Sequence, residues 1–206
     1  MELIHLHPHN PEKRLLKKII EILKNDGVII YPTDTLYGFG CDITSTKALE
    51  RIAKIKNLDH RKANFSFLIE DISRINDYAK PFSNTIFKLI KRNVPGPFTF
   101  ILDANNLVPK MLKNNKKTVG VRIPDSIIAI EIVKELGNPL LTSSIPLTDE
   151  DEEMYPSDPE NLFEKWKYFV DLVVDGGIGG IEHSTIIDCT GNEPEITRQG
   201  KGKLVY

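Results

Sequence analysis

The sequence has little cysteine and no long apolar run. Its 206 residues include two cysteines, Cys41 and Cys189, which lie far apart within apolar segments. This excludes a metal site built from closely spaced cysteines, and we expect two buried free thiols. No apolar segment approaches the roughly 20 residues that cross a bilayer, and the first residues lack the features of a signal peptide. We therefore expect a cytoplasmic protein that does not enter a membrane.

The sequence also lacks a large excess of either charge. It has 27 basic and 29 acidic side chains, a net charge of −2, which gives no overall argument for binding nucleic acid. Basic side chains gather at 13–18, 60–62, 91–92, 113–117 and 198–203, and acidic ones at 149–153. Because such clusters are usually solvated surface, they do not identify a partner by themselves.

The pattern of apolar residues predicts alternating helices and strands. After a short strand, Asn10 can cap a helix with Pro11 in its first turn, and residues 25–27 end that helix. Further helices are expected at 83–92, 126–136 and 159–168, and strands at 28–31, 65–69, 97–102, 118–123, 139–143, 171–174 and 184–189. We predict a single α/β domain, residues 1–206, with a mixed sheet. The acidic segment 148–158 is either a lid or a plain surface loop.

The predicted strand 28–31 runs directly into the string PTDTLYG at 32–38. Proline ends the strand and glycine permits a turn, which leaves hydroxyls and one carboxylate at the strand end. Ligands collect at such ends in open α/β sheets. Asp34 is therefore either part of a binding site or a turn residue that bonds to nearby backbone.

Six motifs, in order, resemble those of the YrdC family, the threonylcarbamoyl-AMP synthases of tRNA modification. PTDTLYG is similar to the opening motif, and the others are PGPFTFIL at 95–102, VGVRIP at 119–124, LLTSS at 140–144, STIID at 184–188 and ITRQG at 196–200. They span about residues 25–202, and chance does not give six motifs in register. HPHNPEKRL at 7–15, HRKANFSFLIED at 60–71 and DGGIGG at 175–180 are similar to the YciO branch of this family.

The resemblance implies a twisted mixed sheet flanked by helices, with a concave electropositive groove. Members of the family combine threonine, bicarbonate and ATP into threonylcarbamoyl-AMP and pyrophosphate, with Mg²⁺ offsetting phosphate charge. A carbamate of threonine attacks the α-phosphorus, so the protein aligns two anions and stabilises charge as pyrophosphate departs. The resemblance thus implies ATP with Mg²⁺, and threonine or another small acyl donor, as ligands.

The resemblance also assigns roles to individual side chains. Lys56 and Ser143 are expected to be catalytic, and with Arg198 they are expected to bind the nucleotide. The cations suit phosphate or carboxylate groups. The expected substrate-binding residues are Thr33, Thr35, Tyr37, Thr142, Arg122, Ser184 and Thr185, and no residue is expected to ligate a metal.

Several positions depart from the family pattern. Leu58 and Ile145 stand where active members carry an arginine and an asparagine, and Ile69 or Glu70 stands in place of a usual histidine. Losing one preorganised donor can cost roughly a hundredfold to a thousandfold in rate. The nearby segment 60–62 is either a substitute source of positive charge or an exposed basic turn. The sequence therefore predicts a weak or divergent synthase.

Two functional hypotheses stay open at this stage. The first is an enzyme of the nucleotidyl-transfer class, which the retained Lys56, Arg122 and Arg198 favour. The second is a module without synthase activity that binds tRNA or double-stranded RNA, because the family's groove has also been linked to RNA. Leu58 and Ile145 weaken only the first hypothesis. A purely structural or regulatory adaptor has no positive signature, and no P-loop, GxGxxG or serine-triad motif competes. We favour the enzyme.

Overall fold

The computed structural model describes residues 1–58, 65–112, 117–146 and 157–206. Its strands are β1 (Glu2–His5), β2 (Ile29–Tyr31), β3 (Gly38–Gly40), β4 (Ser66–Leu68), β5 (Phe98–Asp103), β6 (Thr118–Arg122), β7 (Leu140–Ser144), β8 (Leu172–Asp175), β9 (Thr185–Asp188) and β10 (Glu195–Arg198). Its α-helices are α1 (Lys13–Lys24), α2 (Thr46–Ile55), α3 (Ile75–Tyr78), α4 (Asn84–Asn93), α5 (Ile127–Leu136) and α6 (Pro159–Trp166). The segment 60–62 and most of the expected loop 148–158 lie outside the described residues.

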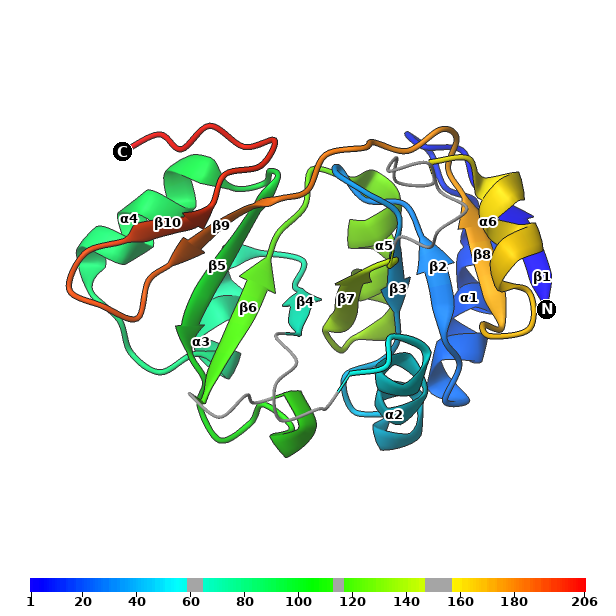
Figure 1. Cartoon of the computed structure of the whole chain (residues 1–206), viewed down its shortest axis with the longest axis horizontal. Coiled ribbons are helices and arrows are strands. Elements are labelled where there is room, and N and C mark those ends of the chain that lie inside the picture. The colour runs from blue at the N-terminus through cyan, green and yellow to red at the C-terminus, as the bar shows by residue number, and fades with distance from the viewer. Residues whose placement is uncertain (59–64, 113–116, 147–156) are drawn as a thin grey trace.

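The strands form one mixed sheet in the order β1-β8-β2-β3-β7-β4-β6-β5-β9-β10. Parallel pairs join β1 with β8, β8 with β2, β4 with β6 and β5 with β9, and the other neighbours are antiparallel. In Figure 1 the strands β4, β5, β6, β9 and β10 lie on the left and the strands from β7 to β1 on the right. This confirms the expected α/β fold with a mixed sheet.

Helices cover both faces of the sheet, because its buried strands are apolar on both sides. On one face α1 and α5 pack with Ile29 and Tyr31 of β2. The neighbouring residue Ile30 points to the opposite core, which α2, α4 and α6 complete. The positions of these helices around the sheet are visible in Figure 1. Alternate residues of one strand therefore hold the two layers of helices in place.

Helix α1 begins later than the sequence predicted. It starts at Lys13, and Glu12 occupies the N-cap without a capping side-chain bond. Asn10 lies in a preceding turn, where its backbone N–H donates to Nδ1 of His7 at 3.1 Å. The prediction of an Asn10 cap was therefore wrong, because the histidine ring ties Asn10 into that turn. The remaining helix follows the predicted period, with Leu16, Ile19, Ile20 and Leu23 buried.

The two cysteines are buried and free, as predicted. Burial raises the pKa of both thiols, and that of Cys189 reaches about 12. Both side chains therefore act as small apolar groups at neutral pH. Among the described helices, none is long and apolar enough to cross a membrane.

Candidate functional site

A polar cavity of about 160 Å³ opens where the ends of several strands converge. The loop between β2 and β3, the C-terminal end of α2, strand β7 and the start of β9 all contribute to its wall. The described residues that line it are Thr35, Leu36, Tyr37, Gly38, Lys56, Leu58, Phe65, Ser66, Thr99, Arg122, Thr142, Ser143, Ser144, His183, Ser184, Ile186 and Arg198. An engineered cavity of about 150 Å³ admits benzene, so this one has room for a small amino acid.

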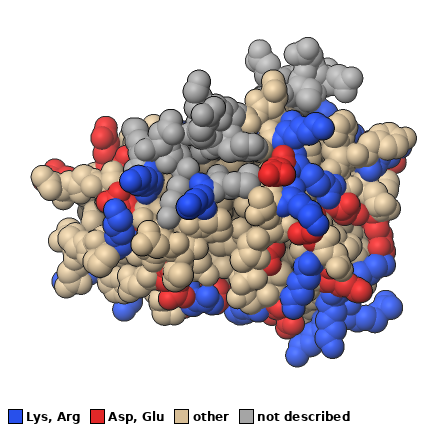
Figure 2. Space-filling view, turned by 90° about the horizontal axis from the view of Figure 1, so that it is seen from below, with Lys and Arg blue, Asp and Glu red and all other residues tan. Residues whose placement is uncertain are grey.

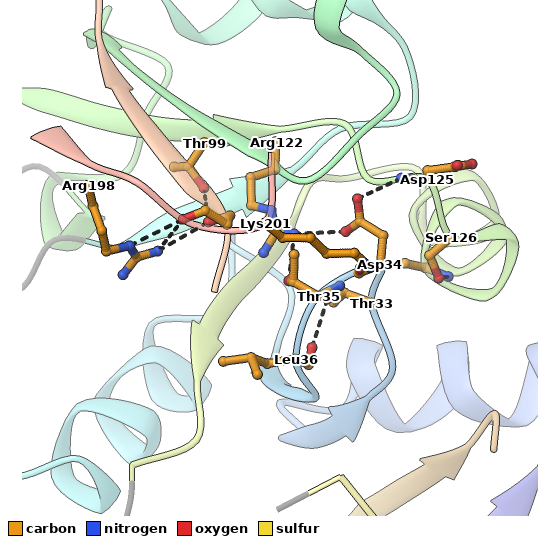
Figure 3. A network of polar contacts seen from close by, with 12 residues as sticks. Thr33, Asp34, Thr35, Leu36, Thr99, Arg122, Asp125, Ser126, Arg198 and Lys201 are labelled. Atoms are coloured by element: carbon orange, nitrogen blue, oxygen red, sulfur yellow. Dashed lines mark hydrogen bonds and ion pairs between the residues drawn. The ribbon is translucent and has the colours of Figure 1, made fainter. Parts of the chain in front are cut away.

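The PTDTLYG loop is fixed by a buried ion pair. Nη2 of Arg122 donates to Oδ1 of Asp34 at 2.9 Å and to the hydroxyl of Thr35 at 3.0 Å (Figure 3). The Arg122 and Asp34 side chains are only 9% and 7% exposed. The second carboxylate oxygen of Asp34 accepts from the backbone N–H of Asp125 at 3.1 Å. Asp34 thus bonds to backbone, as the turn alternative expects, and also positions an arginine that lines the cavity.

The glycine-rich segment 175–180 packs against the same loop. A Cβ atom at Gly180 would lie 2.1 Å from the carbonyl oxygen of Thr35, so only glycine allows this approach. The Tyr37 hydroxyl donates to the Gly177 carbonyl at 2.7 Å and accepts from the Gly176 N–H at 3.1 Å. Burial raises the pKa of Tyr37. Tyr37 therefore lines the cavity as a neutral residue whose hydroxyl is already bonded.

Lys56 reaches the cavity because α2 ends there. It is the C-cap of α2, and its ammonium group donates to the carbonyl oxygen of Ser144. No carboxylate among the described residues pairs with it. Burial lowers the pKa of Lys56 to about 8, because the charged form loses hydration. A bound anion would restore that lost stabilisation.

Arg198 lines the cavity from the end of β10. Its Nη2 donates to the Ser184 carbonyl at 2.8 Å and lies 3.2 Å from the Ser184 hydroxyl. That hydroxyl is also within 2.8 Å of the Thr99 hydroxyl, which links β5 to the start of β9 (Figure 3). The motifs at 95–102, 184–188 and 196–200 are therefore brought together by strand pairing.

His183 is a cavity residue that the sequence analysis missed. It lies directly before the STIID motif, and this position is the signal that would have found it. Burial lowers its pKa, and the nearby positive charges of Arg198, Lys56 and Arg122 lower it further. No described residue that lines the cavity carries a carboxylate. The cavity is therefore electropositive, as the resemblance implied.

Most of the predicted site residues meet at this cavity. Thr35, Tyr37, Lys56, Arg122, Thr142, Ser143, Ser184 and Arg198 line it. Thr33 and Thr185 do not, and both have structural bonds instead: the Thr33 hydroxyl donates to the Leu36 carbonyl, and the Thr185 hydroxyl donates to the Gly202 carbonyl, each at 2.7 Å. Of the two departures, Leu58 lines the cavity, whereas Ile145 is 2% exposed and lies in the core.

The Sua5_yciO_yrdC family profile, described as "Telomere recombination", matches residues 21–200. YciO of Escherichia coli is 38% identical over 204 residues, which is 98% of this chain and 97% of YciO. Its crystal structure covers 98% of this chain and 96% of YciO with a TM-score of 0.90.

Relatives with named activities or ligands are more distant. The threonylcarbamoyl-AMP synthase of Bacillus subtilis is 29% identical over 184 residues, which is 87% of this chain and 51% of the synthase. The structure of Sua5 from Pyrococcus abyssi, complexed with L-threonine, shares the fold with a TM-score of 0.86 at 24% identity, over 96% of this chain and 57% of Sua5. With the profile match and the likeness to YciO over nearly the whole chain, these findings show that the chain belongs to the Sua5/YciO/YrdC family.

Proposed function

We propose that the cavity binds a small amino acid such as L-threonine, that ATP binds next to it with its phosphates at the cations of the cavity, and that the chain forms threonylcarbamoyl-AMP slowly. The observation that carries this proposal is the convergence of Lys56, Arg122 and Arg198 on a cavity whose described walls hold no carboxylate. Three cations that converge on one cavity suit a ligand with several negative charges. The synthase relatives and the L-threonine complex of Sua5 support this choice of ligands.

In this proposal two sets of lining residues have different roles. Lys56, Ser143 and Arg198 contact the nucleotide, and Arg122, Thr35 and Thr142 orient the amino acid. Arg122 is rigid because Asp34 holds it, so its guanidinium needs no reorganisation when a carboxylate arrives. No nucleophile of the protein is required, because the substrates supply both the attacking carbamate and the departing pyrophosphate.

Magnesium belongs to this proposal as part of the ATP complex. Among the described residues there is no group of three or more histidine, cysteine or acidic side chains that could hold a metal ion. The cavity lining provides hydroxyl and carbonyl oxygens but no carboxylate. The ion would therefore arrive on the phosphates, where it offsets their charge.

Leu58 is the reason to expect slow turnover. It lines the cavity at the position where the resemblance places an arginine, and an aliphatic side chain cannot donate a hydrogen bond to a phosphate. Binding depends mainly on groups that are retained, whereas the rate depends on charge that develops in the transition state. The proposal is thus a competent binding site with reduced catalysis, linked to tRNA modification through its product.

The RNA-binding alternative has weaker support. Among the described residues, Figure 2 shows lysine and arginine side chains in several groups on the face in view, with acidic side chains between them. A protein that holds a duplex by its phosphates needs several cations in line. The alternative remains a prediction that salt dependence can test.

Threonine-dependent release of pyrophosphate tests the proposal. The purified chain would be incubated with ATP, Mg²⁺, bicarbonate and L-threonine, with omission of threonine as the blank. Lys56→Ala should abolish the threonine-dependent signal, and Lys54→Ala, on an exposed position of α2, should leave it unchanged. Release that is equal with and without threonine, or unchanged in Lys56→Ala, would contradict the proposed function.

A further inference from the structure

An amino acid must lose a proton before its amine can react with bicarbonate, and the cavity offers few groups to accept it. The titratable residues among the described lining residues are Tyr37, Lys56, Arg122, His183 and Arg198. The Tyr37 hydroxyl is bonded at both sides, and an arginine does not give up its proton in proteins. Lys56 is mostly protonated at neutral pH, because its pKa is about 8. His183 is therefore the lining residue best suited to accept a proton.

The backbone of His183 is held firmly at the cavity wall. Its carbonyl oxygen accepts from the N–H of Lys201 at 2.9 Å, and a Cβ atom at Gly200 would lie 2.3 Å from that oxygen. The next residue, Ser184, is tied to Thr99 and Arg198. His183 thus lines the cavity from a fixed backbone, and cations assigned to the substrates lie close enough to lower its pKa.

We propose that His183 is the general base that takes the proton from the α-ammonium group of the amino acid. This inference rests on the proposed function and adds to it a residue that acts before adenylation. The α-ammonium gives one proton to the imidazole, and the freed electron pair of nitrogen forms a bond to the carbon of bicarbonate. The carbon–hydroxyl bond then breaks, the hydroxide takes a second proton from the same nitrogen, and water leaves. The products are the carbamate, one water and an imidazolium.

Nucleotide binding makes His183 a stronger base in this scheme. Among the described residues, the charged groups that lower the pKa of His183 are the cations Arg198, Lys56 and Arg122. In the free protein these cations and burial keep the pKa of His183 below its usual value, so the ring is neutral at pH 7. Bound phosphates offset the cations and raise that pKa again, so the ring gains affinity for a proton when ATP is present. Carbamate formation is therefore favoured when ATP is bound, so that adenylation can follow.

The first test compares His183→Gln with His9→Gln, a control at an exposed histidine that does not line the cavity. In the parent, threonine-dependent pyrophosphate release should fall as the pH drops through the pKa of His183. His183→Gln should lose about a hundredfold or more in rate and lose this acid limb, while retaining ATP affinity. His183→Ala should regain rate on addition of imidazole, which a merely structural role would not allow. An unchanged rate and pH profile in His183→Gln would overturn the inference and leave the proposed function standing.

A second readout is independent of adenylation. With ¹³C-bicarbonate, L-threonine and a nucleotide analogue that cannot transfer its α-phosphoryl group, ¹³C NMR should show protein-bound carbamate above the level without protein. His183→Gln should remove that signal, and His9→Gln should retain it. If the parent releases no pyrophosphate but forms carbamate that depends on His183, the synthase proposal fails and this inference stands. Carbamate that is absent in the parent, or equal in His183→Gln, would overturn it.

Discussion

The polar and the apolar residues of the cavity lining differ in how much of the family's pattern they keep. The polar residues include Thr35, Arg122, Ser184 and Arg198, each fixed by hydrogen bonds to a neighbouring strand or loop. The apolar residues are Leu36, Leu58, Phe65 and Ile186. The groups that recognise anions are thus retained, whereas a group expected to stabilise developing charge is lost. Binding and turnover therefore depend on different residues of the cavity and can be separated by mutation.

The largest effect, on stability, is expected when the ion pair of the polar residues Arg122 and Asp34 is broken. Arg122→Met leaves Asp34 as a buried charge without its partner, which typically costs about 3–5 kcal/mol. We expect the free energy of unfolding, measured by chemical denaturation, to fall by this amount.

Lys134→Met is a suitable control because Lys134 forms an ion pair with Glu131 on the exposed surface. Its loss should cost about 1 kcal/mol or less. Adding Asp34→Asn to Arg122→Met should recover part of the lost stability, since the unpaired charge disappears. Equal losses of unfolding free energy in Arg122→Met and Lys134→Met would show that the pair of Arg122 with Asp34 does not stabilise the cavity wall.

The next effect is on the reaction rate and concerns Leu58, one of the apolar residues of the lining. Leu58 is 39% exposed and lines the cavity, so an arginine there can reach a bound phosphate without entering the core. Leu58→Arg should raise the rate of threonine-dependent pyrophosphate release by about a hundredfold, the usual contribution of one preorganised donor. Leu58→Met is the matched control and should leave the rate unchanged. A folded Leu58→Arg variant that is no faster would mean that the pocket serves another substrate or binding alone.

Ile145 behaves differently from Leu58 in the structure. Because its side chain is 2% exposed in the core, Ile145→Asn buries an amide among apolar groups. We expect a loss of roughly 1–3 kcal/mol in stability and no gain in rate. A rate gain in the double variant Leu58→Arg with Ile145→Asn that exceeds the product of the two single gains would instead show that both residues act as a unit on one transition state.

Most of the fold could be predicted from the sequence because its elements have clear periods and ends. The helix predicted at 126–136 is α5 (Ile127–Leu136), which Ser126 caps and Gly137 ends with a φ of 76°. Strand β3 was missed because its Gly-Phe-Gly sequence is typical of a turn, and only pairing with β2 and β7 makes it a strand. Helix α2 (Thr46–Ile55) was also missed, although Ser45 caps it. Long-range pairing thus decided what local patterns left open.

The site was less predictable than the fold. Motif matching found the cations, but a hydroxyl at a strand end can point into a cavity or back to the chain. Thr35 lines the cavity, whereas the hydroxyl of Thr33, two residues earlier, bonds the turn. His183 was missed because it precedes a motif rather than lying within one. Only the three-dimensional arrangement distinguishes these cases.

A smaller effect should come from removing one anion-binding group. Lys56→Ala should weaken ATP binding by roughly ten- to a hundredfold, the usual range for a hydrogen bond to a charged group. Calorimetry would measure the dissociation constant, with Lys54→Ala as the control. In the parent the affinity should fall as the pH rises through about 8, since Lys56 loses its proton there and with it the positive charge. A pH-independent affinity that Lys56→Ala does not change would remove Lys56 from the site.

The smallest effect is expected for RNA. The cavity has about 160 Å³, which is too small for a duplex, so any RNA would contact exposed basic residues outside it. Its affinity should fall steeply as salt rises from low to physiological ionic strength, with little sequence preference. Lys56→Ala should change that affinity less than twofold, although it weakens ATP binding much more. An affinity that ignores salt would contradict phosphate-based binding. A drop of about one in the slope of log affinity against log salt in Lys56→Ala would instead place RNA phosphates at the cavity itself, where RNA and ATP would compete.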